Sequence, residues 1–89
     1  MRYEHDPKKL AENVAKHQVW FEVAEGFEWK IAQIIVDNRR QYAETRFLAT
    51  GLVALRVYVL VFCFHETKIR LISLRKANPR EVNHYARDH

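Results

Sequence analysis

Apolar residues recur at helical spacing near both ends of the chain and at strand spacing between them. The pattern predicts a first helix over residues 6–17, with Asp6 as its N-cap and Pro7 at the first helical position, where a missing N–H costs nothing. Its expected buried stripe is Leu10, Val14 and His17. Lys8 and Lys9 lie near the positive end of the helix dipole, where a positive charge slightly destabilises the helix. This position suggests that the two lysines have a role other than stabilising the helix.

A second, shorter helix is predicted over residues 21–27. Phe21, Ala24 and Phe27 recur there every three residues, and Gly26 weakens the end of the segment. The last helix is predicted to begin after Asn78, because Asn78 and Glu81 can form a capping box around Pro79. Its apolar stripe is Val82, Tyr85 and Ala86.

Five segments have strand character, namely residues 2–4, 30–37, 45–53, 56–64 and 69–76. The last three are joined by links of roughly two to four residues, which favours antiparallel hairpins over parallel crossovers. Residues 56–64 are nearly all apolar, as in a central strand that is covered on both faces.

The predicted order is therefore β-α-α-β-β-β-β-α. This order defines an α+β fold, with an antiparallel sheet packed by two N-terminal helices and one C-terminal helix. The 89 residues fit one domain, residues 1–89, and the 48% hydrophobic content is enough for a small core.

Composition narrows the class further. The single cysteine excludes an internal disulfide and favours a reducing compartment. The first residues have no apolar signal segment, and the longest apolar run, residues 57–64, is too short to span a bilayer. We therefore expect a cytoplasmic protein without a membrane partner.

The net charge of +4 is concentrated in the second half of the chain. Residues 46–89 carry eight Lys and Arg against three acids, whereas residues 1–45 carry seven against eight. Most of the excess is arginine, whose planar fork of donors suits phosphate. A basic surface of this kind is typical of nucleic-acid binding and is also common on surfaces that bind nothing.

Arg70 and Arg75 lie on the last predicted strand, where simple alternation places them on opposite faces. An arginine between apolar strand neighbours is either paired with a carboxylate, here Glu44 or Glu66, or directed at an anion. The pattern leaves both interpretations open for each arginine.

The histidines offer candidates for proton transfer. His65 lies beside Glu66 on a connection, where it is either a general base for a ribose hydroxyl or an ordinary polar turn residue. His17 closes the stripe of the first helix and is expected to be structural. Cys63 and His65 are too few to hold zinc, and no glycine-rich phosphate loop or Ser-His-Asp order is present, so neither metal nor cofactor is expected.

The chain resembles the BrnT toxins of bacterial type II toxin–antitoxin systems over almost its whole length. The first helix carries Asp6-Pro7-x-Lys9-x3-Asn13-x2-Lys16-His17, followed by Phe21 and Ala24. The middle carries Glu44-x-Arg46-Phe47-x3-Gly51. The end carries Ile69-Arg70-x-Ile72-Ser73-x-Arg75-Lys76-Ala77, then Glu81 and Tyr85.

The resemblance implies a RelE-like fold and a metal-independent ribonuclease that arrests growth by cleaving RNA. It also implies a ribbon-helix-helix antitoxin similar to BrnA, which neutralises the toxin and binds operator DNA together with it. Family membership would make Arg46, Arg70 and Arg75 functional, with Lys76 nearby.

Three features depart from the family pattern. Gln18 stands where similar proteins often have glycine, and Val19-Trp20 stands where a serine is expected to cap the second helix. His65-Glu66 stands where similar proteins often have Arg-Gly. This last change replaces a fixed positive charge with a titratable one beside a carboxylate, which would weaken activity or make it depend on pH.

The leading hypothesis is an RNA-cleaving toxin in which Arg70 and Arg75 bind the scissile phosphate and His65 or Glu44 transfers the proton. The residues expected to position the RNA backbone are Arg46, Lys76 and Arg80. The alternatives are a non-catalytic module that binds nucleic acid or an acidic partner, and a toxin homologue that has lost activity.

Overall fold

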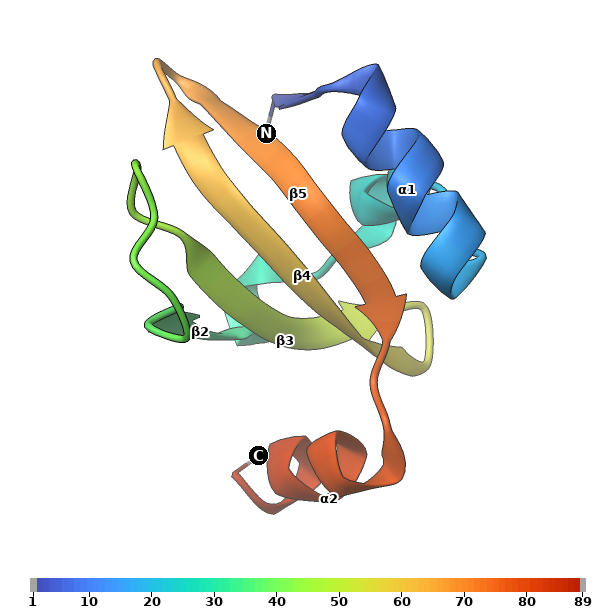
Figure 1. Ribbon diagram of the computed structural model, residues 1–89. Helices are drawn as coiled ribbons and strands as arrows, with labels where there is room; N and C mark the ends of the chain where they lie inside the picture. The colour runs from blue at the N-terminus through green and yellow to red at the C-terminus, as the bar shows by residue number, and fades with distance from the viewer. Residues whose placement is uncertain (1, 89) are drawn as a thin grey trace.

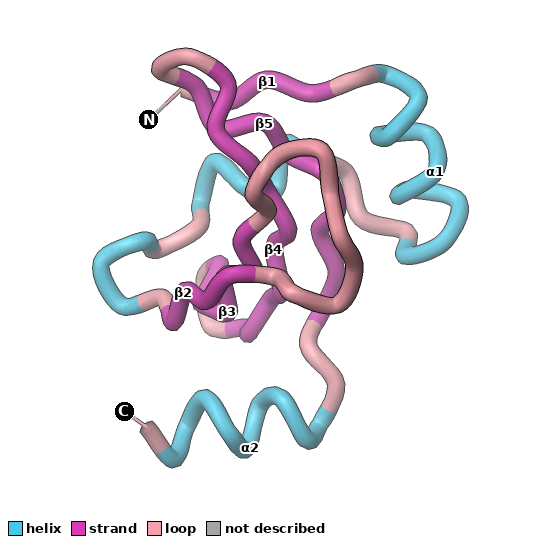
Figure 2. The backbone as a smooth tube through the Cα atoms, turned by 60° about the vertical axis from the view of Figure 1, so that its left-hand side comes forward, coloured by secondary structure: helices cyan, strands magenta, loops and turns pink. Residues whose placement is uncertain are grey.

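The computed structural model describes residues 2–88 and contains one five-stranded sheet with helical segments at its edge and end (Figures 1 and 2). The elements are β1 (Tyr3–His5), α1 (Pro7–His17), the 3₁₀ turns η1 (Phe21–Gly26) and η2 (Trp29–Ile31), β2 (Gln33–Val36), β3 (Phe47–Val53), β4 (Arg56–His65), β5 (Lys68–Lys76) and α2 (Pro79–Arg87). The α+β class is as predicted.

The sheet has the strand order β1-β5-β4-β3-β2, with β4 in the centre. The pairs β2–β3, β3–β4 and β4–β5 are antiparallel, whereas β1 runs parallel to β5. The expectation of a wholly antiparallel sheet was therefore wrong for this edge strand. Short hairpin links impose antiparallel pairing on β3, β4 and β5, but most of the chain separates β1 from β5 and leaves their relative direction free.

The predicted second N-terminal helix is not an α-helix. Phe21–Gly26 forms a 3₁₀ turn whose N-cap, Trp20, makes no side-chain capping bond. Phe21, Ala24 and Phe27 are all buried, and a spacing of three residues matches the three residues per turn of a 3₁₀ helix. The structure therefore has one N-terminal α-helix, α1, and one C-terminal α-helix, α2.

The core lies on the face of the sheet that η1 covers. Its buried residues include Phe21, Ala24, Leu60, Phe62, Leu71 and Leu74. Phe27 packs so closely against β3 that a Cβ on Gly51 would lie 2.7 Å from its ring, which explains the glycine at that position. The central strand is buried from Val59 to Cys63, as its apolar run predicted, whereas Tyr58 is half-buried and Phe64 is exposed.

The strand predicted at residues 30–37 is reduced to β2, because Trp29–Ile31 turns into η2 before the sheet begins. The predicted helix at the C-terminus is confirmed. Asn78 accepts from the backbone N–H of Glu81 and the Glu81 side chain accepts from that of Asn78, which completes the capping box. Tyr85 is buried and donates its hydroxyl to the carbonyl of Ile31.

A β-bulge in β5 overturns the prediction that Arg70 and Arg75 lie on opposite faces. Val61 of β4 pairs with Ser73, but the next residue, Phe62, pairs with Leu71, so one residue of β5 is extra. An extra residue reverses the alternation beyond it. Both arginines consequently project from the face opposite the core.

The predicted stripe of α1 is only half-buried, and the one fully buried side chain of that helix is Asn13. The Asn13 carboxamide donates to the carbonyls of Leu74 (2.8 Å) and Val19 (2.9 Å) and accepts from the Leu74 N–H (3.0 Å). Because β1 pairs with β5 only as far as Leu71, Asn13 occupies the position that a neighbouring strand would take beside Leu74. α1 is thereby fixed along the β5 edge (Figure 1).

Replacing Asn13 with alanine is expected to lower the free energy of unfolding by about 3 kcal/mol, because buried backbone groups of Leu74 and Val19 lose their partners. Urea unfolding followed by circular dichroism measures this change. The matched control is Asn83→Ala on the exposed face of α2. Equal midpoints for the two variants would contradict the role assigned to Asn13.

Candidate functional site

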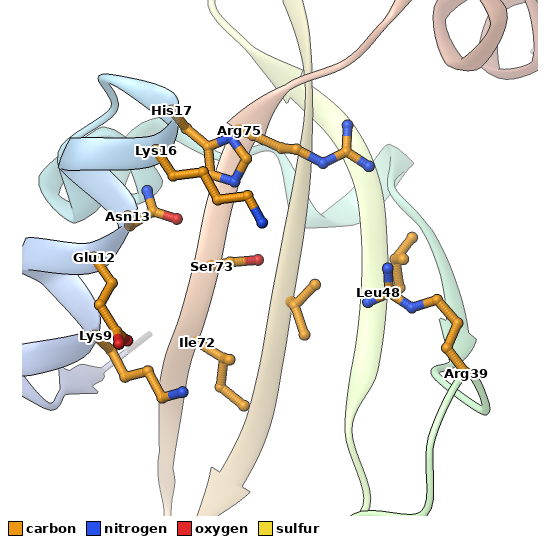
Figure 3. A pocket seen from close by; sticks show the side chains of 11 residues that line it. Lys9, Glu12, Asn13, Lys16, His17, Arg39, Leu48, Ile72, Ser73 and Arg75 are labelled. Carbon is orange, nitrogen blue, oxygen red and sulfur yellow. The ribbon is translucent and has the colours of Figure 1, made fainter.

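The face of the sheet opposite the core is hollowed into a groove of about 470 Å³ between α1 and the segment that follows β2 (Figure 3). Its floor is formed by apolar and small side chains, among them Leu48, Val61 and Ser73. A second hollow of about 440 Å³ shares Arg39 and Ser73 with the first and extends it toward Arg46. Together they form one continuous surface, which we call the groove.

Arg75 stands at the C-terminal end of β5 on the groove face (Figure 3). Its two terminal nitrogens donate to the two oxygens of Glu81 at 2.8 Å each. The pair holds the pKa of the Glu81 carboxyl below its usual range and raises that of Arg75. Glu81 also caps α2, so one carboxylate fixes both the helix and the guanidinium. Arg75 is thus rigidly placed and partly neutralised, with 29% of its side chain exposed.

Arg70 lies near the opposite end of β5, in a cluster with Glu4 and His65. Glu4 is its cross-strand neighbour on β1, and the Glu4 Oε2 atom lies 2.6 Å from the Arg70 guanidinium and 3.0 Å from His65 Nδ1. His65 Nδ1 also lies 3.1 Å from Arg70 Nη2. His65 and Arg70 together lower the pKa of the Glu4 carboxyl. Carboxylate pairing is therefore the outcome for both arginines, but with Glu4 and Glu81 rather than Glu44 or Glu66.

Three further arginines lie on the segment between β2 and β3: Arg40 lines the second hollow, and Arg39 and Arg46 are paired with carboxylates. Arg39 forms a two-point ion pair with the buried Asp37, at 2.8 Å for each contact, and the Tyr42 hydroxyl donates to the same carboxylate. These contacts hold the pKa of Asp37 far below its usual range. Arg46 donates to Glu44 at 3.1 Å, and its guanidinium lies 4.2 Å above the Tyr42 ring.

Lys76 and Arg80, which were predicted to contact phosphate, do not line the groove. Lys76 follows Arg75 on β5 and projects from the other face, where its cross-strand neighbour is Tyr58. Arg80 lines a separate hollow of about 430 Å³ on α2, together with Thr50 and His84.

The structure does not bring the four predicted catalytic residues into one cluster. Arg70 and Arg75 pair with Cys63 and Val59, which are four residues apart on β4, about 13 Å at the usual rise of about 3.3 Å per residue. His65 accompanies Arg70, whereas Glu44 accompanies Arg46. The predicted catalytic residues therefore lie in separate places along one face of the sheet.

α1 supplies basic residues that the sequence did not single out for this site. Lys9, Lys16 and His17 line the groove opposite Arg39 (Figure 3). They form no ion pair with any residue from 2 to 88, unlike Arg39, Arg46, Arg70 and Arg75 on the same face. The position of Lys9 at the unfavourable end of the helix dipole was the one sequence feature that could have pointed to these basic residues.

A family model described as "Ribonuclease toxin, BrnT, of type II toxin-antitoxin system" matches residues 5–81 of the chain. No curated protein matches it. Within the described part of the chain, His, Cys, Asp and Glu side chains form no group of three able to hold a metal ion. Among residues 2–88, no helix combines the length and apolarity needed to cross a bilayer.

Glu4 is expected to make stability depend on pH, because its pKa is lower in the folded chain than its ordinary value of 4.5. A lowered carboxyl pKa contributes stability above the unfolded value, and the contribution is lost as the pH falls through the folded value. Glu4→Gln should therefore be less stable than the wild type at pH 7, and the difference should vanish on acidification below pH 4.5. Urea unfolding between pH 7 and 3 checks this. A pH-independent difference would show that Glu4 acts through packing alone.

Proposed function

This chain belongs to the BrnT family of type II toxin–antitoxin ribonuclease toxins, and from that premise we propose that it cleaves RNA in the groove without a metal ion. The observation that carries the proposal is the position of Arg75, a guanidinium held rigidly by Glu81 at the rim of a basic groove. We further propose that the fold is of the RelE-like class and that the protein acts in the cytoplasm.

The chemistry suits the residues present. RNA carries its own nucleophile, the 2′-hydroxyl, so the protein needs to orient the strand, stabilise charge on the phosphate and move protons. Arginine supplies preorganised donors for the phosphate oxygens. Arg75 binds the scissile phosphate, while Arg46 and Arg70 hold phosphates further along the strand.

The spread of basic residues along the face favours a polymeric substrate. Arg70, Arg75 and Arg46 are each held in place by a carboxylate, so an RNA strand laid across the face would meet them in fixed positions. His65 and Glu44 are the predicted proton-transfer groups beside Arg70 and Arg46. Lys76 and Arg80 would contact only RNA that extends beyond the groove.

Membership of a type II system implies a protein antitoxin. We propose that it is a ribbon-helix-helix protein similar to BrnA, that it neutralises the toxin, and that the complex binds operator DNA. Uninhibited cleavage of RNA would arrest growth.

A second function is favoured by one observation. Four arginines outside α2 are already paired with carboxylates, namely Arg39, Arg46, Arg70 and Arg75. Such pairing reduces the charge available to a transition state, which fits a module that binds RNA or an acidic partner without cleaving it. An inactive toxin homologue would have the same appearance.

The proposal predicts that purified protein cleaves total RNA equally well with and without a chelator. Arg75→Gln should reduce the cleavage rate by about 100-fold or more, because it removes the fixed charge at the phosphate. The matched control is Arg56→Gln, an equal change of charge on an exposed residue at the start of β4.

Product analysis on denaturing gels and circular dichroism of each variant separate cleavage from folding. Stable complexes with intact RNA would establish the binding module instead. Loss of cleavage on chelation would overturn metal independence.

A further inference from the structure

We propose that His17 of α1 is the group that takes the proton from the 2′-hydroxyl of the RNA, next to the phosphate that Arg75 holds. This inference rests on the proposed ribonuclease function and replaces neither its substrate nor its reaction class. It assigns a catalytic role to a residue whose sequence pattern predicted only a structural one.

The geometry of α1 places His17 beside Arg75. Asn13 and His17 are four residues apart and therefore lie on the same side of the helix. Asn13 is locked to both backbone groups of Leu74, the residue that precedes Arg75 on β5. The last turn of α1 is thereby brought against the end of the strand, and the His17 ring lies next to the Arg75 side chain at the groove (Figure 3).

The end of the helix fixes the ring in this position. α1 ends immediately after His17, at Gln18, which adopts a left-handed conformation with φ of 57° and returns its N–H to the Val14 carbonyl. The chain then buries Val19 in the core. His17 is held between this sharp turn and the sheet, and it is only half-buried, so a ribose in the groove can reach it.

The surroundings keep the imidazole neutral. Burial lowers the pKa of His17, and the positive charges of Lys16 and Arg75 lower it further. The other charged groups that line the hollow around His17 are Lys9 and Glu12, on preceding turns of α1, and Arg39 on the opposite side. A neutral imidazole at pH 7 accepts a proton, which is the property a general base requires.

The other candidates for the proton-accepting group already form hydrogen bonds within the protein. His65 Nδ1 is shared between Glu4 and Arg70, and Glu44 is bonded to Arg46. The His17 ring makes no hydrogen bond within the described residues, so both of its nitrogens remain available to substrate. His17 is thus the titratable group of the groove that is both adjacent to Arg75 and uncommitted.

The step balances without any further reagent except water. The unprotonated nitrogen of His17 takes the 2′-hydroxyl proton while the 2′ oxygen forms a bond to phosphorus. The bond from phosphorus to the 5′ oxygen breaks, and that oxygen leaves with the electron pair and takes a proton from water. The imidazolium then returns its proton to the hydroxide. The products are a 2′,3′-cyclic phosphate and a 5′-hydroxyl end.

The test compares wild type, His17→Gln and His84→Gln, the last being a matched control on the exposed surface of α2. His17→Gln is expected to reduce the cleavage rate at saturating RNA by about 100-fold or more and to leave RNA affinity unchanged. His84→Gln should cleave as the wild type does. Added imidazole should restore part of the activity of His17→Ala.

The pH profile distinguishes a base from a merely structural residue. The wild-type rate should rise with pH and level off once His17 is deprotonated, and His17→Gln should lack this rise. Lys16→Met should move the rise to higher pH, because the lysine charge lowers the pKa of His17. Circular dichroism and urea unfolding establish that each variant is folded.

The outcomes separate the two proposals. A wild-type protein that cleaves no RNA overturns the proposed function and this inference together. If the wild type cleaves RNA and folded His17→Gln cleaves it at the same rate with the same pH profile, only the assignment of His17 fails.

Discussion

The arrangement of this molecule depends on the hydrogen bonds between the Asn13 carboxamide and the edge of β5. β1 covers only the first part of that edge. Without Asn13, the backbone N–H and C=O of the buried Leu74 would have no hydrogen-bond partner. One amide side chain has a donor and an acceptor in the same plane, as a peptide group does, so it can take the place of the missing strand. The same bonds attach α1 to the sheet and create one wall of the groove.

Carboxylate pairing organises the charge on the groove face. Each of Arg39, Arg46, Arg70 and Arg75 is bound to an acid, from the same segment for the first two and from other elements for the last two. The pairs fix long side chains that would otherwise lose entropy on meeting a ligand. They also reduce the excess positive charge, which leaves the lysines of α1 and Arg40 as its main sources within the groove.

The chemistry proposed for the groove follows from these two features together. Asn13 brings the end of α1 to the end of β5, and Glu81 holds Arg75 at the same place. The His17 ring and the Arg75 side chain then line the same hollow of a basic surface. Cleavage by an internal 2′-hydroxyl requires little more than a proton acceptor and a stabiliser of phosphate charge.

The sequence by itself determined the α+β class, the capped helices, the central position of β4 and the family, because each of these depends on local patterns and motifs. The Asp6 and Asn78 caps and the apolar run of β4 are properties of neighbouring residues. The tertiary structure alone decided which residues share the groove. The bulge in β5 depends on pairing with β4, the parallel β1 on a distant strand, and the position of His17 on a bond from Asn13 to a residue 61 positions away. The periodicity of the sequence does not predict such contacts. They join segments that are far apart in the chain, and the sequence pattern does not say which distant segments lie side by side in the fold.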